Sequence, residues 1–172
     1  RAAGNVKGQA QGAFDFSACK KYPEGLELIA DPEVELVDIC LPTFLHLEYA
    51  RAVLRAGKHL LIEKPLARTA EEAAEIAREA RSAKGMSMCA LCMRFWPGWD
   101  WLKDAVARGT YGKVLAAWFR RVASHPGGMY YSDGKLCGGA ALDLHIHDAD
   151  FIQYLFGIPR AVQSRGYSKV SG

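Results

Sequence analysis

Two short motifs hold residue types that together could do acid–base chemistry. Asp143 and His147 follow the glycine pair Gly138-Gly139, and their i, i+4 spacing predicts that both lie on one face of a helix. A carboxylate beside an imidazole fixes the ring's tautomer and prepares it for proton transfer. Lys64, at the end of an apolar run, supplies a positive charge that would stabilise a developing alkoxide. These residues predict a site that acts on an alcohol or a carbonyl.

The composition excludes several classes of protein. Half of the 172 residues are apolar, 24% are charged and 10% are aromatic, as in soluble globular proteins. The 22 basic and 19 acidic residues are interspersed, so no basic run predicts a nucleic-acid partner. No apolar stretch reaches the ~18–20 residues that span a bilayer, so we expect no membrane partner.

The cysteines indicate a reducing compartment. Their number, five, is odd, and no secretion signal precedes them, so we expect free thiols and a cytoplasmic protein. Cys89 and Cys92 have the spacing of a redox or zinc motif, but they lie inside the apolar run 86–93. Because no second cysteine pair completes a zinc site, we interpret them as structural.

Three apolar runs predict the strands that position the lysine. Residues 36–41 read as a strand buried on both faces, residues 59–62 as a second strand that ends at Glu63-Lys64-Pro65, and residues 86–93 as a third. A helix begins at a Thr43 cap and ends at Gly57.

A second helix lies between the second and third runs. It begins at the capping box formed by Thr69 and Glu72 and ends at Gly85. This alternation predicts parallel strands joined by right-handed crossovers, hence an α/β fold whose ligands bind beyond the carboxyl ends of the strands. Pro42-Thr43 and Lys64-Pro65 both stand at such ends.

The pattern changes after Arg94. A helix with Leu102 and Val106 facing inward is followed by predicted strands at residues 113–122 and 161–169, which flank the helix of Asp143 and His147. A strand of this kind needs partners in a sheet. We interpret Arg120 and Arg121 as surface charges.

Two other functions are compatible with the residues near His147. His145, His147, Asp148 and Asp150 suggest a metal-dependent hydrolase, although helix positions two apart diverge by ~200° and share one ion poorly. His145 and Asp148 lie off the face of Asp143 and His147, and we interpret them as structural residues or as supports of the site residues. Asp150 continues the face of Asp143 and borders the site. The third possibility is a non-catalytic remnant that serves as a binding or dimerisation module.

Three motifs in register resemble the Gfo/Idh/MocA family of NAD(P)-dependent oxidoreductases. They are Pro42-Thr43 with His46 shortly after, Ala56-Gly57-Lys58-His59 leading to Glu63-Lys64-Pro65, and the glycine-pair motif that ends at His147. The resemblance extends from about Tyr22 to the end of the sequence. It implies a Rossmann-type sheet over residues 1–93, joined near Arg94 to an α+β substrate and oligomerisation domain over residues 94–172.

The resemblance also implies roles for individual residues. Lys64 would be the catalytic lysine, Asp143 the substrate-orienting carboxylate and His147 the general acid/base. The residues expected to bind NAD or NADP are Pro42, Thr43, His46, Glu63, Lys64 and Arg94, and no metal is expected. The substrate would be a sugar, a polyol or a related compound, and the full-length protein a homo-oligomer. The family often has a cis peptide before the motif proline, so we predict a cis Lys64-Pro65 bond against a base rate of ~5–6%.

One feature of such proteins is missing. No G-x-G-x-x-G phosphate turn occurs in the sequence, although the pyrophosphate of a dinucleotide normally rests on that turn and the helix after it. We therefore expect an internal fragment of a longer oxidoreductase, which by itself would be inactive and would bind the dinucleotide poorly.

Overall fold

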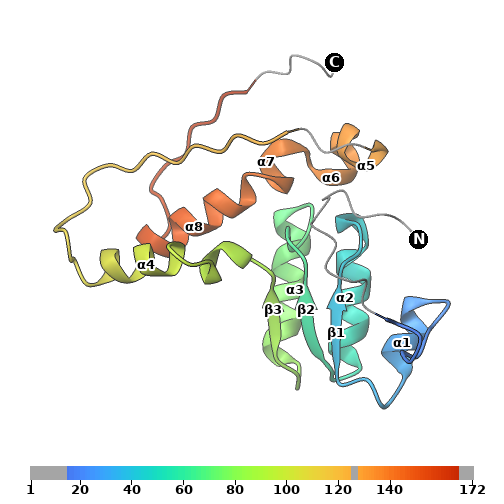
Figure 1. Cartoon of the computed structure of the whole chain (residues 1–172). Helices are drawn as coiled ribbons and strands as arrows, with labels where there is room; N and C mark the ends of the chain where they lie inside the picture. Colours follow the sequence, from blue (N-terminus) through green and yellow to red (C-terminus); the bar gives the residue numbers. More distant parts are fainter. Residues whose placement is uncertain (1–14, 125–127, 167–172) are drawn as a thin grey trace.

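The fold is built around a three-stranded parallel sheet. The computed structural model describes residues 15–124 and 128–166 (Figure 1). Strands β1 (Leu36–Ile39), β2 (His59–Ile62) and β3 (Ser87–Cys89) pair in sequence order. Ile39 stands opposite Ile62, and Ile62 opposite Cys89, so the strands end level with one another. The predicted α/β architecture, a partial Rossmann-type sheet, is confirmed.

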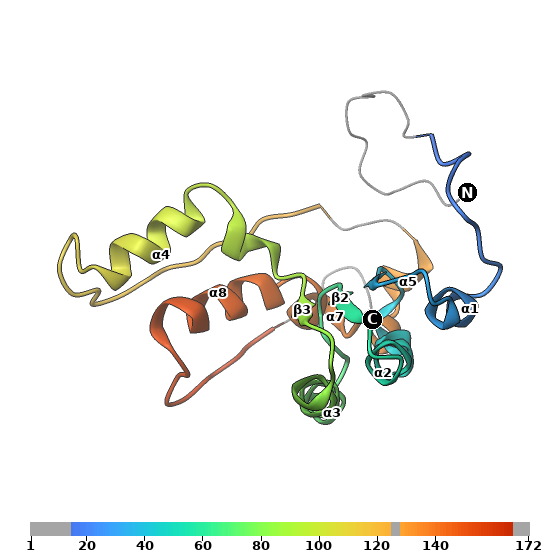
Figure 2. The ribbon, with the colours of Figure 1, turned by 90° about the horizontal axis from the view of Figure 1, so that it is seen from below.

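The two connecting helices lie on the same face of this sheet. The short 3-10 helix η1 (Thr43–Leu45) leads into α2 (His46–Arg55), and α3 (Ala70–Ser82) follows β2. Seen along the strands, α2 and α3 lie next to each other below the sheet (Figure 2). Successive right-handed crossovers between neighbouring strands place their helices in this way. The core between them is apolar and consists of Ile29, Val37, Ile39, Ala50, Val53, Leu54, Leu60, Ile62, Ala67 and Ile76.

The prediction of a strand buried on both faces is wrong for the described residues. Burial alternates along β1, where Val37 and Ile39 are buried and Leu36 remains 56% exposed. In the described part of the chain no helix covers the face opposite α2 and α3, because both crossovers run on the same side (Figure 2). The short helix α1 (Gly25–Ala30) packs against α2 instead.

The helix boundary signals are mostly correct. Gly57 ends α2 with a positive φ of 73°, and the Thr69 hydroxyl accepts a hydrogen bond from Glu72 N at 3.1 Å. The Glu72 carboxylate binds Arg68 N, so only one of the two capping-box bonds forms with Thr69. Thr43 is not the cap we predicted, because its hydroxyl contacts Tyr130.

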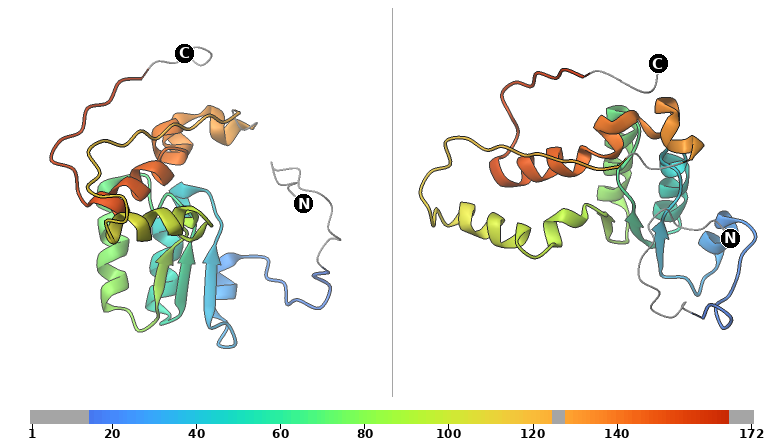
Figure 3. Two further views of the ribbon diagram at one scale, coloured as in Figure 1. Left: turned by 60° about the vertical axis from the view of Figure 1, so that its left-hand side comes forward. Right: turned by 45° about the horizontal axis from the view of Figure 1, so that its top comes forward.

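The regular elements in the described second half of the chain are all helices. Residues 92–124 and 128–166 contain the 3-10 helix η2 and five α-helices, and α4 and α8 lie side by side in every view (Figures 1 and 3). The Trp99 ring meets Phe151 edge-on at 4.9 Å and joins these two helices. The elements are η2 (Cys92–Phe95), α4 (Trp99–Ala107), α5 (Met129–Ser132), α6 (Gly134–Cys137), α7 (Gly139–Asp143) and α8 (Ile146–Phe156).

The two strands predicted in this half are wrong as far as the structure describes them. Residues 113–124 and 158–166 form no helix or strand in the described chain, and residues 167–169 lie outside it. An apolar stretch becomes a strand only when a neighbour pairs with its backbone. No helix among the described residues is both long and apolar enough to cross a membrane.

Candidate active site

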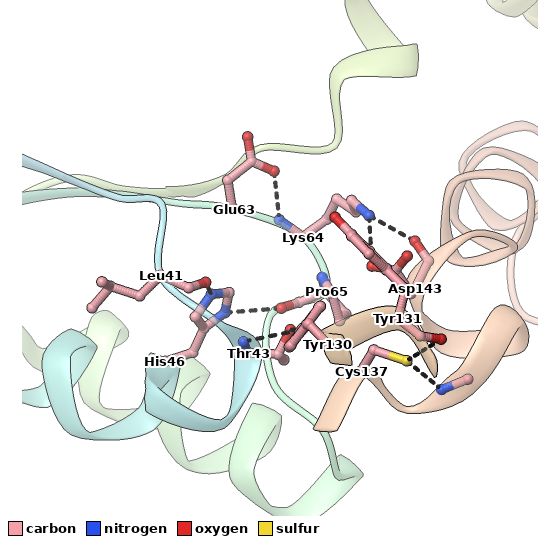
Figure 4. Close-up of polar contacts among 11 residues, drawn as sticks. Leu41, Thr43, His46, Glu63, Lys64, Pro65, Tyr130, Tyr131, Cys137 and Asp143 are labelled. Atoms are coloured by element: carbon pink, nitrogen blue, oxygen red, sulfur yellow. Dashed lines mark hydrogen bonds and ion pairs between the residues drawn. The ribbon is translucent and has the colours of Figure 1, made fainter. Parts of the chain in front are cut away.

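A pocket opens where the carboxyl ends of β1 and β2 meet the short helices α5–α7. Its volume is about 350 Å³, within the ~300–1,000 Å³ range of small-molecule sites. The lining residues come from both halves of the chain (Figure 4). They are Cys40, Leu41, Pro42, Thr43, Glu63, Lys64, Tyr130, Tyr131 and Asp143. The pocket therefore lies at the sheet edge where the sequence predicted it.

Lys64 follows the end of β2, and its side chain reaches across to Asp143 at the end of α7. Its ammonium donates to the backbone oxygen of Asp143 at 2.7 Å and to the Asp143 carboxylate at 3.1 Å (Figure 4). Both side chains are about four-fifths buried, with 20% and 18% exposed. The Glu63 carboxylate accepts a bond from Lys64 N at 3.1 Å, and the Lys64-Pro65 bond is cis, as predicted. Lys64 is thus a partly buried cation whose position is fixed from both sides.

Asp143 and His147 do not share one helix face, which corrects the sequence-based prediction. Helix α7 ends at Asp143 and α8 begins at Ile146. The amides of Leu144 and His145 both bond to Ala140 O, so the turn holds an extra residue and the i, i+4 relation is lost. Asp143 bonds to Lys64 rather than to the imidazole. The glycine pair does release α7, since Gly138 and Gly139 have φ of 79° and 72°.

His147 has the properties of a neutral acid/base group. Its Nδ1 atom is buried and has no hydrogen-bond partner. Burial, followed by the charges of Lys64 and Arg121, lowers the pKa of His147 below its ordinary value of 6.5. The ring is therefore uncharged near pH 7 and can accept a proton there.

His46 lies beneath the pocket and does not line it. Its ring is fully buried, and the two ring nitrogens contact Pro65 O at 3.0 Å and Leu41 O at 2.9 Å (Figure 4). The imidazole therefore joins the loops that follow β1 and β2, and no ring nitrogen is left for a ligand. In this structure His46 positions the pocket, which differs from the cofactor contact implied by the family resemblance.

Tyr130 is a pocket residue that the sequence reasoning missed. Its hydroxyl lies 2.9 Å from the Thr43 hydroxyl and accepts a weaker bond from Thr43 N at 3.4 Å. Beside it, Cys137 Sγ accepts a bond from Gly139 N at 3.3 Å and so holds the loop before α7 (Figure 4). The only signal in the sequence was that this loop is rich in glycine and tyrosine, which identifies no contact.

Arg94 and Asp150 bind each other. The Arg94 guanidinium donates to both carboxylate oxygens of Asp150, with Nε–Oδ2 at 2.8 Å, and its charge lies over the Tyr154 ring. This bond raises the pKa of Arg94. Arg94 thus fastens η2 to α8, and Asp150 makes this contact instead of bordering the pocket as predicted.

Arg121 is not the free surface charge predicted from the sequence. Its guanidinium binds both oxygens of Asp148, at 2.6 Å and 2.9 Å, and holds the pKa of that carboxyl below its ordinary value. Asp148 is buried, whereas Arg120 is exposed, as expected of a surface charge.

The metal-site alternative finds no support in residues 15–124 and 128–166. No group of three or more His, Cys, Asp or Glu side chains in these ranges is placed to hold a metal ion. The Asp148 carboxylate that a metal would need is already bound to Arg121. Cys89 and Cys92 are free thiols, and burial raises the pKa of Cys89 to about 11, as suits a structural cysteine.

Two family models cover nearly the whole sequence. The model of the oxidoreductase family with an NAD-binding Rossmann fold matches residues 4–91. The model of the GFO/IDH/MocA C-terminal domain matches residues 99–172.

Known proteins of this family are similar to the chain at moderate identity. Myo-inositol 2-dehydrogenase of Thermotoga maritima is 35% identical over 80% of this chain and 41% of its own length. 1,5-Anhydro-D-fructose reductase of Ensifer adhaerens is 36% identical over 75% of this chain and 40% of its own length.

A solved structure is also similar to the chain. Levoglucosan dehydrogenase in complex with NADH and levoglucosan is 30% identical, with a TM-score of 0.68 over 79% of this chain and 39% of that protein. The chain thus spans about two-fifths of the length of the relatives it matches. With both family models matched in order around the pocket of Lys64 and Asp143, the chain belongs to the Gfo/Idh/MocA family of oxidoreductases.

Proposed function

We propose that the protein is an NAD(P)-dependent dehydrogenase that acts on a hydroxyl carbon of a sugar, a polyol or a related compound. The observation that carries this proposal is the Lys64–Asp143 ion pair, which fixes a cation in the wall of a pocket at the carboxyl ends of parallel strands. Relatives whose names specify sugar or polyol substrates support the substrate class.

Three side chains would share proton transfer, charge stabilisation and positioning. His147, neutral near pH 7, accepts the hydroxyl proton during oxidation and returns it during reduction. Lys64 donates a hydrogen bond to the substrate oxygen as negative charge develops there. Asp143 accepts a hydrogen bond from Lys64 and holds the lysine in place, in addition to the orientation of His147 or of the substrate expected from the sequence.

The pocket fits the reactive end of a nicotinamide cofactor. Pro42, Thr43 and Glu63 line it where Rossmann-type sheets receive dinucleotides, and Lys64 stands beside them. When bound, the cofactor supplies or accepts the hydride. We also propose two domains, residues 1–93 and 94–172, that meet near Arg94, because the last strand of the sheet ends at Cys89 and helices follow from η2 onward.

The setting of the protein is also a proposal. The free thiols among the described residues suit a reducing cytoplasm. Leu115 and Trp118 leave about 90% of their surface exposed, which favours a homo-oligomer in which other surfaces cover them. Light scattering after size-exclusion chromatography would test this state, and a monomer would exclude it.

A spectrophotometric screen tests the activity. The full natural protein is mixed with NAD⁺ or NADP⁺ and a panel of inositols, aldoses and anhydrosugars, and absorbance of the reduced cofactor is followed. We expect turnover with at least one polyol or sugar, and His147→Ala should lower it by ~10²–10⁴. Absence of turnover with every substrate and both cofactors would contradict the proposal.

A further inference from the structure

The Arg121–Asp148 pair lies directly beside His147 and has no role in the function described so far. Asp148 follows His147 in α8, and its carboxylate is bound at both oxygens by Arg121 from the extended segment after α4. The same guanidinium lies 2.9 Å from Met93 Sδ in η2. Arg121 therefore joins three parts of the chain at the residue next to the imidazole.

We propose that Arg121 is a positioning residue that neutralises Asp148 and so keeps the His147 imidazole uncharged as a base. This rests on the proposed acid/base role of His147. A buried carboxylate next to an imidazole stabilises the protonated ring. A guanidinium bound to both carboxylate oxygens cancels that effect, and its fork geometry holds the carboxylate in one orientation.

The surroundings of the ring agree with this assignment. A protonated imidazole donates from both nitrogens, whereas His147 Nδ1 is buried among atoms that offer it no acceptor. The charges that act on the ring come from three elements. They are Lys64 and Glu63 after β2, Arg121 on the extended segment, and Asp148 on α8 itself.

Three further charged groups on the neighbouring elements have partners of their own. Each is bound by another group and is less able to compensate for a change at Arg121. The pairs are Arg94 of η2 with Asp150, Asp143 of α7 with Lys64, and Lys103 of α4 with the ring and carbonyl of Tyr154. Arg121 is the cation bound to both oxygens of Asp148, and the exposed His145 ring lies 3.5 Å from Oδ2 of the same carboxylate.

Nuclear magnetic resonance of the histidine rings measures this effect directly. The sequence has five histidines, so a spectrum of His147→Gln assigns the His147 signals in the full natural protein. We expect Arg121→Gln to raise the pKa of His147, because Asp148 is left uncompensated. Asp148→Asn should lower that pKa, because Arg121 then acts on the ring unopposed.

Two further variants separate charge from mere packing. Arg120→Gln is the matched control, since it removes the same charge from the exposed neighbouring residue and should leave the His147 pKa unchanged. Arg121→Lys keeps the charge and should hold the pKa near that of the parent. If Arg121→Gln fails to fold, the downward shift in Asp148→Asn and the unchanged value in Arg121→Lys carry the test.

Two results would overturn the proposal. One is a His147 pKa that is the same in Arg121→Gln as in the parent, and the other is an equal shift in Arg120→Gln. The ring titration needs no substrate, so it judges the proposal independently of the dehydrogenase assignment. The pH dependence of kcat/KM then tests the base role of His147 separately. If the ring pKa moves as expected in the variants but the low-pH fall of kcat/KM does not move with it, His147 is not the base, while the effect of Arg121 on the ring is retained.

Discussion

The sheet half of the chain and the half from η2 to α8 are held together in different ways. In the first, ten buried apolar side chains form one continuous cluster between the strands and α2 and α3. In the second, the described buried apolar residues are only Met93, Ala105, Cys137 and Phe151, and ion pairs join the elements together with the Trp99–Phe151 contact.

This contrast has a consequence for the site. Lys64 is presented by the half that packing holds rigid, whereas Asp143 and His147 are presented by the half that polar contacts hold in place. Hydrophobic packing is non-directional, while ion pairs and hydrogen bonds depend on specific geometry. Changes to the first half should therefore affect global stability, and changes to the second should affect the geometry of the site.

The largest effect should follow from removing the two side chains to which we assign proton transfer and charge stabilisation. Lys64→Ala or His147→Ala in the full natural protein should lower kcat by ~10²–10⁴ while cofactor affinity changes far less, because each removes stabilisation specific to the transition state. Steady-state kinetics and a cofactor titration measure both quantities.

Matched variants show whether the charge or the position matters. Lys84→Ala removes an exposed lysine and His145→Ala an exposed histidine, and both should keep nearly full turnover. Near-normal kcat in Lys64→Ala or His147→Ala would remove that residue from the proposed mechanism.

Core truncations in the two halves should destabilise different parts of the molecule. Ile62→Ala creates a cavity under the sheet, and Phe151→Ala creates one between α4 and α8; each should cost about 2–5 kcal/mol. Ile62→Ala should speed hydrogen exchange throughout the sheet, whereas Phe151→Ala should speed it in α4 and α8 while β2 stays protected. Equal loss of protection in β2 would show that the halves unfold as one unit and would contradict the comparison.

Breaking the Arg94–Asp150 pair should have an intermediate effect. Both groups are partly buried, so Arg94→Ala should cost ~1–3 kcal/mol, and the loss should appear in α8 and not in the sheet. Arg94→Lys keeps the charge but not the two-pronged contact, and should recover only part of it. Hydrogen exchange in α8 together with kcat measures the effect, and unchanged values for Arg94→Ala would show that packing alone holds α8.

The smallest effect concerns the Thr43–Tyr130 bond across the pocket. Thr43→Val keeps the side-chain shape and removes the hydroxyl, so the two halves should lose ~0.5–1.5 kcal/mol of coupling. A double-mutant cycle of thermal stability with Tyr130→Phe isolates this interaction. Strictly additive losses would mean that the two hydroxyls do not interact in solution.

The local elements were predictable because their signals are local. The apolar run before Pro42, the cap at Thr69 and the stop at Gly57 each depend on neighbouring residues, and the structure confirms them. The placement of Lys64 at a strand end is of the same kind, since parallel strands share one edge. For the strands predicted at residues 113–122 and 161–169, local pattern was insufficient because a strand also needs a partner.

Contacts between distant residues could not be predicted in this way. Nothing near Arg121 identifies Asp148 as its partner, and nothing near Thr43 identifies Tyr130. The break between α7 and α8 could not be predicted either. The turn in which two amides bond to Ala140 O contains no glycine or proline that would indicate an extra residue. The sequence therefore indicated that Lys64 and Asp143 belong to one site, but it placed Asp143 beside His147, whereas the structure pairs it with Lys64.

The separation of Lys64 from Asp143 along the chain also sets an order of assembly during synthesis. The two residues lie 79 positions apart, and ribosomes add ~5–20 residues per second. Synthesis of Asp143 therefore follows synthesis of Lys64 by ~4–16 s. The sheet pairs residues close in sequence and can begin to form within that interval. The ion pair therefore closes late, and the pocket is completed only after the strands that frame it.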